Sequence, residues 1–185
     1  MQEGIFEALV SRLTAVEPET RNANRAAVSI ILSEKEVPKI LLIKRAERMD
    51  DPWSGQVAFP GGKSQDTDVS ARQTAVRETR EEVGIDLEAN SEFLGYLGHF
   101  PTHTGAISVI PSVFLLRGKV AVNRSEEVST YRWLDLGRML SPASTVGYTV
   151  TSEGKRVEVP AIRSGDFVIW GLTYRIIRSL SSDRT

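Results

Sequence analysis

The chain has 185 residues, of which 41% are apolar and 25% are charged, and it contains no cysteine. This composition is typical of a globular protein, and it excludes disulfides, thiolate metal sites and a cysteine nucleophile. The formal net charge of −1 gives no overall basic field, so we expect neither a nucleic acid nor a membrane as partner. We expect one α/β domain over residues 1–185, in the cytoplasm, because no signal peptide or membrane-spanning run is recognisable.

The first part of the chain alternates between helical and strand-like patterns. Apolar residues recur at helical spacing from Ile5 to Val16, which predicts a helix that Pro18 ends. Two runs rich in β-branched residues, "RAAVSIILS" and "KILLIK", predict strands. The polar stretch "RAERMDDPWSG" predicts a loop, and "QVAF" predicts a strand that stops at the Pro-Gly-Gly beginning with Pro60.

The next expected element is a helix from Ala71 to Val83. Ser70 and Gln73 have the spacing of a capping box at its start, and Gly84 is suited to close its end. Its expected core stripe consists of Ala75, Val76, Thr79 and Val83. The glutamates of this helix would therefore lie on a different face.

The second half of the chain predicts mostly strands. The runs "EFLGYLGHF", "AISVIPSVFLL" and "EVSTYRWL" have strand character, and "YTVTSEGKRVEV" predicts a hairpin that turns near Gly154. The run "DFVIWGLTYRIIRSL" begins apolar and settles into helical spacing, which predicts a C-terminal helix over about residues 170–180.

Three glutamates crowd one part of the helix, at Glu78, Glu81 and Glu82. Like charges at these spacings repel, and each pair destabilises the helix by about 0.2–0.5 kcal/mol. One interpretation is a solvated charged face, partly neutralised by Arg77 pairing with Glu81 four residues on. The other is a metal site, because several carboxylates beside the backbone carbonyls of a glycine turn form the hard oxygen set that suits Mg²⁺ or Mn²⁺.

The stretch "GGKSQDTDVSARQTAVRETREEVGI" resembles the signature of the Nudix hydrolases, in which a glycine and an acid precede R-E-x-x-E-E-x-G. Two departures occur, because Asp68 stands where the general pattern has glutamate and the stretch from Asp68 to Arg77 is one residue longer. The resemblance implies an α/β/α sandwich with a mixed sheet. It also implies metal-dependent hydrolysis of a nucleoside diphosphate linked to another moiety.

The resemblance further implies roles for individual residues. Glu78 and Glu82 would hold the metal, and the carbonyl of Gly62 would complete its ligand set. Glu81 would be a further ligand or would help to deprotonate the attacking water. Arg77 would hold a glutamate in orientation, as groups behind metal ligands commonly do.

An additional base outside the signature is a separate hypothesis. Glu126 and Glu127 precede a predicted strand and could reach the site, although a pair of exposed acids is an equally good interpretation. His103 is another candidate because histidine titrates near neutral pH. A histidine in a solvent-facing loop is the simpler interpretation of that position.

Outside the signature, "LLIKRAER" together with "GQVAFPGGK" resembles the coenzyme A pyrophosphatase branch of the family. This resemblance implies cleavage of coenzyme A or acyl-coenzyme A to 4′-phosphopantetheine and adenosine 3′,5′-bisphosphate. It places Arg45, Arg48 and Phe59 at the substrate, where the arginines could contact phosphate bidentately, the 3′-phosphate included. The loop from Arg45 to Gly55 is one residue longer than this branch would have.

Two alternatives remain open at this point. The lengthened "DPWSG" loop, with its Trp53, leaves room for a Nudix hydrolase of ADP-ribose, another nucleotide sugar or a nucleoside triphosphate. A catalytically silent nucleotide-binding module is the other alternative, although the complete set of glutamates speaks against it. In each case the expected partner is a small nucleotide, and a homodimer is a further expectation.

Overall fold

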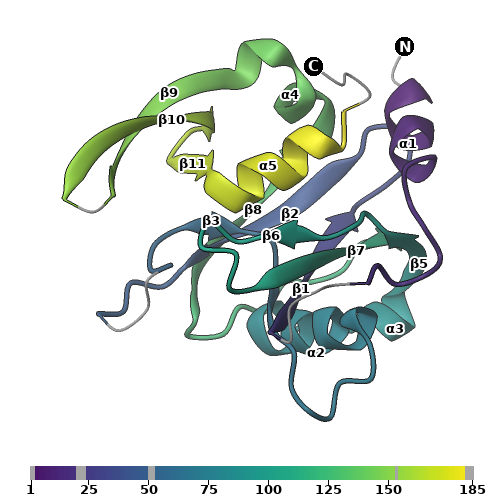
Figure 1. The fold of residues 1–185 in the computed structure, drawn as a ribbon. Coiled ribbons are helices and arrows are strands. Elements are labelled where there is room, and N and C mark those ends of the chain that lie inside the picture. The colour runs from purple at the N-terminus through teal and green to yellow at the C-terminus, as the bar shows by residue number, and fades with distance from the viewer. Residues whose placement is uncertain (1–2, 20–23, 50–52, 153, 182–185) are drawn as a thin grey trace.

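The computed structural model describes residues 3–19, 24–49, 53–152 and 154–181. A mixed β-sheet lies between two groups of helices, with α2 and α3 on one face and α1 and α5 on the other (Figure 1). This arrangement confirms the predicted α/β/α sandwich. The helices are α1 (Glu3–Val10), α2 (Ala71–Val83), α3 (Leu87–Asn90), α4 (Leu136–Leu140), the 3₁₀ turn η1 (Pro142–Ser144) and α5 (Gly171–Ser179).

The strands form two sheets. The main sheet contains β1 (Arg25–Leu32), β2 (Lys39–Arg45), β3 (Val57–Ala58), β4 (Gly61–Lys63), β5 (Ser91–Tyr96), β6 (Phe100–Pro101), β7 (Ser108–Leu116) and β8 (Val128–Asp135). The second sheet contains β9 (Thr145–Ser152), β10 (Lys155–Ser164) and β11 (Phe167–Trp170). The β9–β10 hairpin projects away from the main sheet (Figure 1).

The pairing of β1 and β2 positions the loop that carries the glycines. These two strands are in register only at Leu32 and Ile40. Beyond that point β3 pairs with β2 and β4 pairs with β1, so the chain crosses from one strand to the other at Pro60. The parallel partner of β1 is β7, and β8 lies along β2. The segment around Pro60 is therefore fixed to both strands.

Two hydrophobic cores lie on the two faces of the main sheet, as alternation along the strands requires. Ile30 and Leu42 belong to the core beneath α1 and α5, whereas Ile31 and Leu41 belong to the core beneath α2 and α3. All nine residues of β7 are buried, as expected for a strand covered on both faces.

The predicted N-terminal helix is too long at its C-terminal end. It ends at Val10 rather than Val16. Beyond it, Thr14 pairs with Tyr96 of β5 through two backbone hydrogen bonds of 2.9 and 2.8 Å. An unpaired sheet edge thus draws this segment into extended structure, which the helical spacing of its apolar residues could not indicate.

The other boundaries lie close to the predicted ones, with a few unexpected elements. The predicted C-terminal helix corresponds to α5, and the predicted hairpin corresponds to β9 and β10, with Gly154 at its turn. The short elements α3, α4 and β11 were not predicted. Neither was β4, because two successive glycines indicate a turn rather than a strand. No helix among the described residues has the length and apolar character needed to cross a bilayer.

Candidate active site on the acidic face of α2

Local sequence determines where α2 begins and ends. The Ser70 side chain accepts a hydrogen bond from the Gln73 amide, and the Gln73 side chain accepts one from the amide of Val69. These reciprocal contacts form a capping arrangement at the N-terminus. Gly84 closes the helix in the left-handed region, with φ of 69°. The predicted bounds of this helix are therefore confirmed.

Ser29 of β1 fixes α2 against the sheet. Its hydroxyl donates to the carbonyl of Ala75 at 3.1 Å and accepts from the hydroxyl of Thr79 at 2.7 Å. Its amide donates to the carbonyl of Pro60 at 2.8 Å. One fully buried serine thus links helix, strand and glycine loop. The sequence analysis missed this residue, because a serine within an apolar strand gives no indication of its partners.

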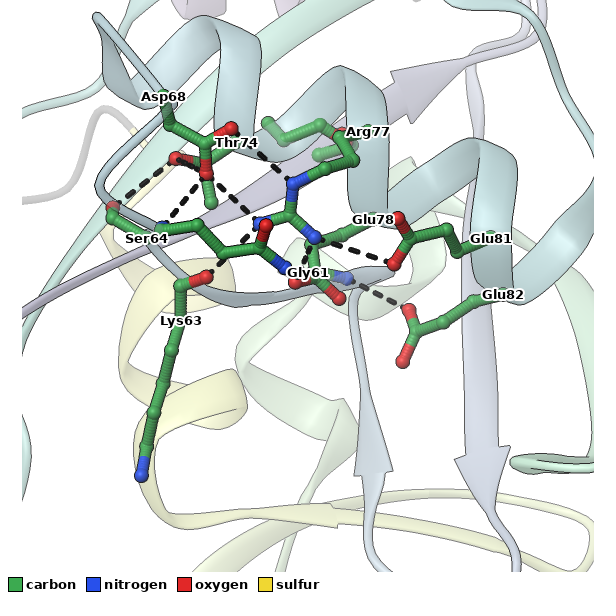
Figure 2. Close-up of polar contacts among 12 residues, drawn as sticks. Gly61, Lys63, Ser64, Asp68, Thr74, Arg77, Glu78, Glu81 and Glu82 are labelled. Carbon is green, nitrogen blue, oxygen red and sulfur yellow. Dashed lines mark hydrogen bonds and ion pairs between the residues drawn. The ribbon is translucent and has the colours of Figure 1, made fainter.

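Arg77 is the centre of the polar network shown in Figure 2. Its Nε and Nη2 donate to the two carboxylate oxygens of Asp68 at 3.2 and 2.9 Å, and Nη2 also donates to the carbonyl of Lys63 at 3.1 Å. Its Nη1 donates to Glu78 at 2.7 Å and to Glu81 at 3.2 Å. All five N–H donors of the guanidinium are used. Arg77 therefore ties the loop before the helix to two of its glutamates.

Asp68 stands where the general signature pattern has glutamate, and in this structure its carboxylate binds the guanidinium of Arg77. Its carboxylate also accepts hydrogen bonds from the amide of Gln65 and the hydroxyl of Thr74. The hydrogen bonds from Arg77 lower the pKa of Asp68 to about 2, and Asp68 in turn raises the pKa of Arg77 well above its ordinary value. The sequence shows both residues, but their pairing depends on how the intervening loop folds.

Glu78 lies against the glycine loop. A Cβ atom built on Gly62 would lie only 2.5 Å from the carboxyl carbon of Glu78. A side chain at position 62 would therefore displace this carboxylate from its present place. Burial raises the pKa of Glu78, against the hydrogen bond from Arg77 that lowers it. A second close approach occurs at Gly61, whose φ is 154° and where a Cβ would meet the carbonyl of Ala27 at 2.3 Å.

Glu82 is the most buried of the three glutamates, with 2% of its surface exposed. The prediction that all three glutamates lie on a face away from the core is therefore wrong for Glu82. One carboxylate oxygen accepts a 2.9 Å hydrogen bond from the amide of Gly61 (Figure 2), and the other oxygen lies 3.7 Å from Nη1 of Arg45. Burial raises the pKa of Glu82 to about 8, with a further increase from the charge of Glu78. A buried carboxylate with so little compensation favours a cation nearby.

The candidates for an additional base occupy different surroundings. The charge of Glu127 contributes to the raised pKa of both Glu78 and Glu82, so Glu127 lies near these two glutamates. Glu127 also pairs with Arg48 at 3.4 Å, which brings the loop after β2 to this edge. Glu126 is exposed, as is His103 in the turn between β6 and β7.

Phe59, which the resemblance places at the substrate, lies in a hydrophobic core. Its side chain is 2% exposed and packs in the core beneath α1 and α5. Strand periodicity explains this placement, because Val57 and Phe59 point to the same side and both are buried. The structure thus gives Phe59 a packing role, and contact of its ring with substrate stays a prediction.

The acidic face fits a divalent cation chemically. Its donors are carboxylate oxygens of Glu78, Glu81 and Glu82 and the backbone carbonyl of Gly62, all hard ligands of the kind that Mg²⁺ and Mn²⁺ prefer. The described residues contain no group of three acidic or histidine side chains already gathered as metal ligands. The reason is visible in the contacts, since Arg77 holds Glu78 and Glu81 while Glu82 turns to Gly61 and Arg45.

Comparisons with known proteins agree with this geometry. The profile of the NUDIX domain matches residues 23–151. An Escherichia coli K12 protein described as uncharacterized Nudix hydrolase NudL is 33% identical over 181 residues, which cover 95% of this chain and 93% of that protein. An uncharacterized Schizosaccharomyces pombe protein, C14C4.10c, is 36% identical over 146 residues, covering 64% of this chain but only 43% of that longer protein.

A solved structure supports the fold. The crystal structure of a MutT/nudix family protein from Enterococcus faecalis superposes with a TM-score of 0.55 at 22% identity, covering 89% of this chain and 63% of that one. The profile match ends before β10, so the predicted extent of the domain, residues 1–185, stays a prediction.

Proposed function

Because the chain belongs to the Nudix family of hydrolases, which act on phosphoric anhydrides, we propose that it is a metal-dependent pyrophosphohydrolase of coenzyme A or acyl-coenzyme A. The products would be 4′-phosphopantetheine and adenosine 3′,5′-bisphosphate. The observation that carries the proposal is the acidic face of α2, whose carboxylates lie against a glycine loop and are arranged by Arg77.

The residues that would hold Mg²⁺ or Mn²⁺ are Glu78, Glu82 and the carbonyl of Gly62, with Glu81 as a further ligand. When bound, such a cation neutralises the diphosphate and lowers the pKa of the attacking water. Arg77 keeps Glu78 in place through a 2.7 Å hydrogen bond, while Asp68 fixes the other edge of its guanidinium. This support fixes the orientation of the Glu78 carboxylate.

Removal of the proton from the attacking water requires a nearby base. Glu81 is the most exposed of the three glutamates, with its side chain at 57% exposure, so it can reach a water above the site. Glu127 is the second candidate, because its charge acts on Glu78 and Glu82. The position of His103 in an exposed turn offers no comparable support.

The substrate assignment rests on the coenzyme A branch resemblance and on two arginines, Arg45 at the end of β2 and Arg48 after it. Arg45 lies close to Glu82, and Arg48 lies in the segment that follows β2, beside Glu127. We assign both to substrate phosphates, because a guanidinium can contact phosphate bidentately. The nearness of Arg45 to a metal ligand favours the diphosphate over the 3′-phosphate. A homodimer and a cytoplasmic location stay predictions, to be tested by light scattering and by fractionation.

A product assay over a substrate panel tests this proposal. The purified protein with Mg²⁺ or Mn²⁺ is given coenzyme A, dephospho-coenzyme A, ADP-ribose and a nucleoside triphosphate, and products are identified by mass spectrometry. Coenzyme A should yield the two products named above at the highest kcat/KM. Efficient cleavage of ADP-ribose with little cleavage of coenzyme A would overturn the substrate assignment and leave the family unchanged. Binding of a nucleotide without turnover would indicate a silent binding module.

A further inference from the structure

Ser29 of β1 is hydrogen-bonded to both parts of the candidate active site. Its hydroxyl contacts α2, because it donates to the carbonyl of Ala75 at 3.1 Å and accepts from the hydroxyl of Thr79 at 2.7 Å. Its amide contacts the glycine loop (residues 60–62), because it donates to the carbonyl of Pro60 at 2.8 Å. The carboxylates that would hold a metal come from α2, and the backbone carbonyl comes from this loop. Both sources of ligands are therefore positioned relative to one residue.

These contacts close a circuit that runs through the site. The amide of Ser29 binds Pro60 of the glycine loop. The next residue, Gly61, donates its amide to the carboxylate of Glu82 at 2.9 Å (Figure 2). Glu82 lies on α2 three residues after Thr79, whose hydroxyl returns to Ser29. A shift of α2 that breaks the contact at Ser29 would therefore also displace Glu82 relative to the loop.

Apolar packing also holds α2 on the sheet. Ala71, Ala75 and Val83 are buried and belong to the core on this face. Apolar burial is non-directional, so it keeps the helix on the sheet without fixing its position along the sheet. Hydrogen bonds have narrow distance and angle requirements. Arg77 supplies such bonds at the more exposed side of the helix, and Ser29 supplies them beneath it.

We propose that Ser29 is a positioning residue for the hydrolytic centre, whose hydroxyl holds α2 in the place where Glu78 and Glu82 meet the glycine loop. This inference rests on the proposed function for the metal, whereas its geometric part concerns the metal-free protein. Ser29→Ala removes the hydrogen bonds to the helix and leaves the backbone bond to Pro60. The loop therefore stays in place while the helix loses its directional contact with β1. The carboxylates are then placed less well relative to the carbonyl of Gly62.

Ser112 of β7 provides a matched control. It is in register with Ser29 on the neighbouring parallel strand, so both side chains lie on the same face of the sheet, and each residue is 0% exposed. The hydroxyl of Ser112 has no hydrogen-bond partner among the described residues. Ser112→Ala therefore removes the same buried group without removing a contact to α2. An equal effect of Ser29→Ala and Ser112→Ala would reflect packing, and a difference between them measures positioning.

The amide of Gly61 reports on the geometry of the metal-free protein. It donates to Glu82, so its hydrogen exchange depends on that contact. Exchange is measured by NMR with a chelator present, relative to amides at the centre of β1 and β7, which report global opening. In Ser29→Ala the Gly61 amide should exchange about fivefold to tenfold faster than in the parent, the effect of weakening one hydrogen bond. Ser112→Ala should leave this relative rate unchanged.

Mn²⁺ titrations followed by electron paramagnetic resonance test the consequence for the metal. Ser29→Ala should bind Mn²⁺ about tenfold more weakly than the parent, the lower end of the loss that is usual when support for metal ligands is removed. Steady-state kinetics at saturating Mn²⁺ should show kcat lower by about tenfold with little change in KM, because the groups that bind substrate stay in place. A merely structural serine would lower stability and leave these values at the level of Ser112→Ala.

Thr79 gives a second way to remove the same contact. Thr79→Val has nearly the shape of threonine without the hydroxyl, so it should reproduce most of the loss of Mn²⁺ affinity. Thr79→Ser keeps the hydroxyl and should bind Mn²⁺ more tightly than Thr79→Val. The double variant of Ser29→Ala and Thr79→Val should be close to Ser29→Ala, because the two residues act through one contact. Unfolding curves show whether each variant is folded, and the two Thr79 variants decide the question if Ser29→Ala is not.

The outcomes separate this inference from the proposed function. Equal Mn²⁺ affinity in the parent and Ser29→Ala, or equal losses in Ser29→Ala and Ser112→Ala, overturns the positioning role while leaving the metal centre intact. Absence of Mn²⁺ binding in the parent overturns the metal centre itself. In that case faster exchange of the Gly61 amide in Ser29→Ala, without a change in Ser112→Ala, still supports the role of Ser29 in placing α2, and unchanged exchange overturns it.

Discussion

The two arginines that flank the acidic face of α2 are held in different ways. Arg77 uses all five of its N–H donors on Asp68, Lys63 and two glutamates, at distances of 2.7–3.2 Å. Arg45 approaches Glu82 at 3.7 Å. A guanidinium whose donors all have partners at hydrogen-bond distance maintains the geometry of the carboxylates around it, whereas the contact of Arg45 with Glu82 is an ion pair longer than a hydrogen bond. The acidic face therefore has one side on which hydrogen bonds from Arg77 arrange Glu78 and Glu81, and another on which Arg45 approaches Glu82 as an ion pair.

The comparison also explains how the crowded glutamates are tolerated. Arg77 lies between Glu78 and Glu81, and Glu82 is separated from them by burial against Gly61. The compensation is incomplete, because burial still raises the pKa of both Glu78 and Glu82. The remaining unfavourable charge would be relieved by a divalent cation.

The largest expected effect is the loss of stability and activity when Arg77, rather than Arg45, is replaced by alanine. Arg77→Ala leaves Asp68 buried without its partner, which should lower the free energy of unfolding by about 3 kcal/mol. Hydrolysis should also fall by about 10–100-fold, as is usual when support for a metal ligand is lost. Arg45→Ala should lower the free energy of unfolding by less than Arg77→Ala does, because the contact of Arg45 with Glu82 is longer than a hydrogen bond. Denaturant unfolding followed by circular dichroism measures both values, and equal losses would contradict the comparison.

The same contrast should appear in the pH dependence of the metal-free protein. The pKa of Asp68 is lowered to about 2 from 3.8, so its stabilisation is present above pH 3.8 and is lost as the pH falls toward 2. The pKa of Glu82 is raised to about 8 from 4.5, so its contribution is fully present below pH 4.5 and is lost as the pH rises through 8.

Unfolding curves with a chelator present, recorded between pH 2 and 9, test these opposite slopes. Asp68→Asn should remove the slope at acid pH, and Glu82→Gln should remove the decline between pH 4.5 and 8. Unaltered profiles in both variants would show that neither carboxyl group is linked to folding.

The smallest effect is expected at Arg48. Its pair with Glu127 is exposed on both sides, with side chains at 47% and 54% exposure. Arg48→Ala should therefore change stability by less than about 0.5 kcal/mol. If Arg48 contacts substrate, KM should still rise by a few fold, which separates a binding role from a structural one. Unchanged KM would remove Arg48 from the substrate site.

Features set by local sequence could be predicted, and those set by distant contacts could not. The bounds of α2 follow from Ser70, Gln73 and Gly84, all within or beside the helix. The N-terminal helix ends early because Thr14 pairs with Tyr96, a partner more than eighty residues away. Helical spacing alone therefore overestimated its length.

The same distinction applies within the site. The spacing of Arg77 and Glu81 indicates their contact, because they lie four residues apart on one helix. The burial of Glu82 depends on β4, which the sequence did not predict, and Phe59 could be placed in the core only once β3 was located. The irregular register of β2 at Arg45 involves Ser129 of β8 (Val128–Asp135), a strand far along the chain. The sequence thus indicated which residues are candidates for the site, but only the fold shows which of them are in contact.

The central claim is that the acidic face of α2 is a metal-dependent hydrolytic centre. The direct test measures initial rates of diphosphate hydrolysis for the parent and for Glu82→Gln, with chelator and after Mg²⁺ or Mn²⁺ is restored. The rate of the parent should vanish with chelator and return with metal. Glu82→Gln, folded as shown by its unfolding curve, should remain at least about 100-fold slower at saturating metal. Turnover of Glu82→Gln at the rate of the parent would contradict the account.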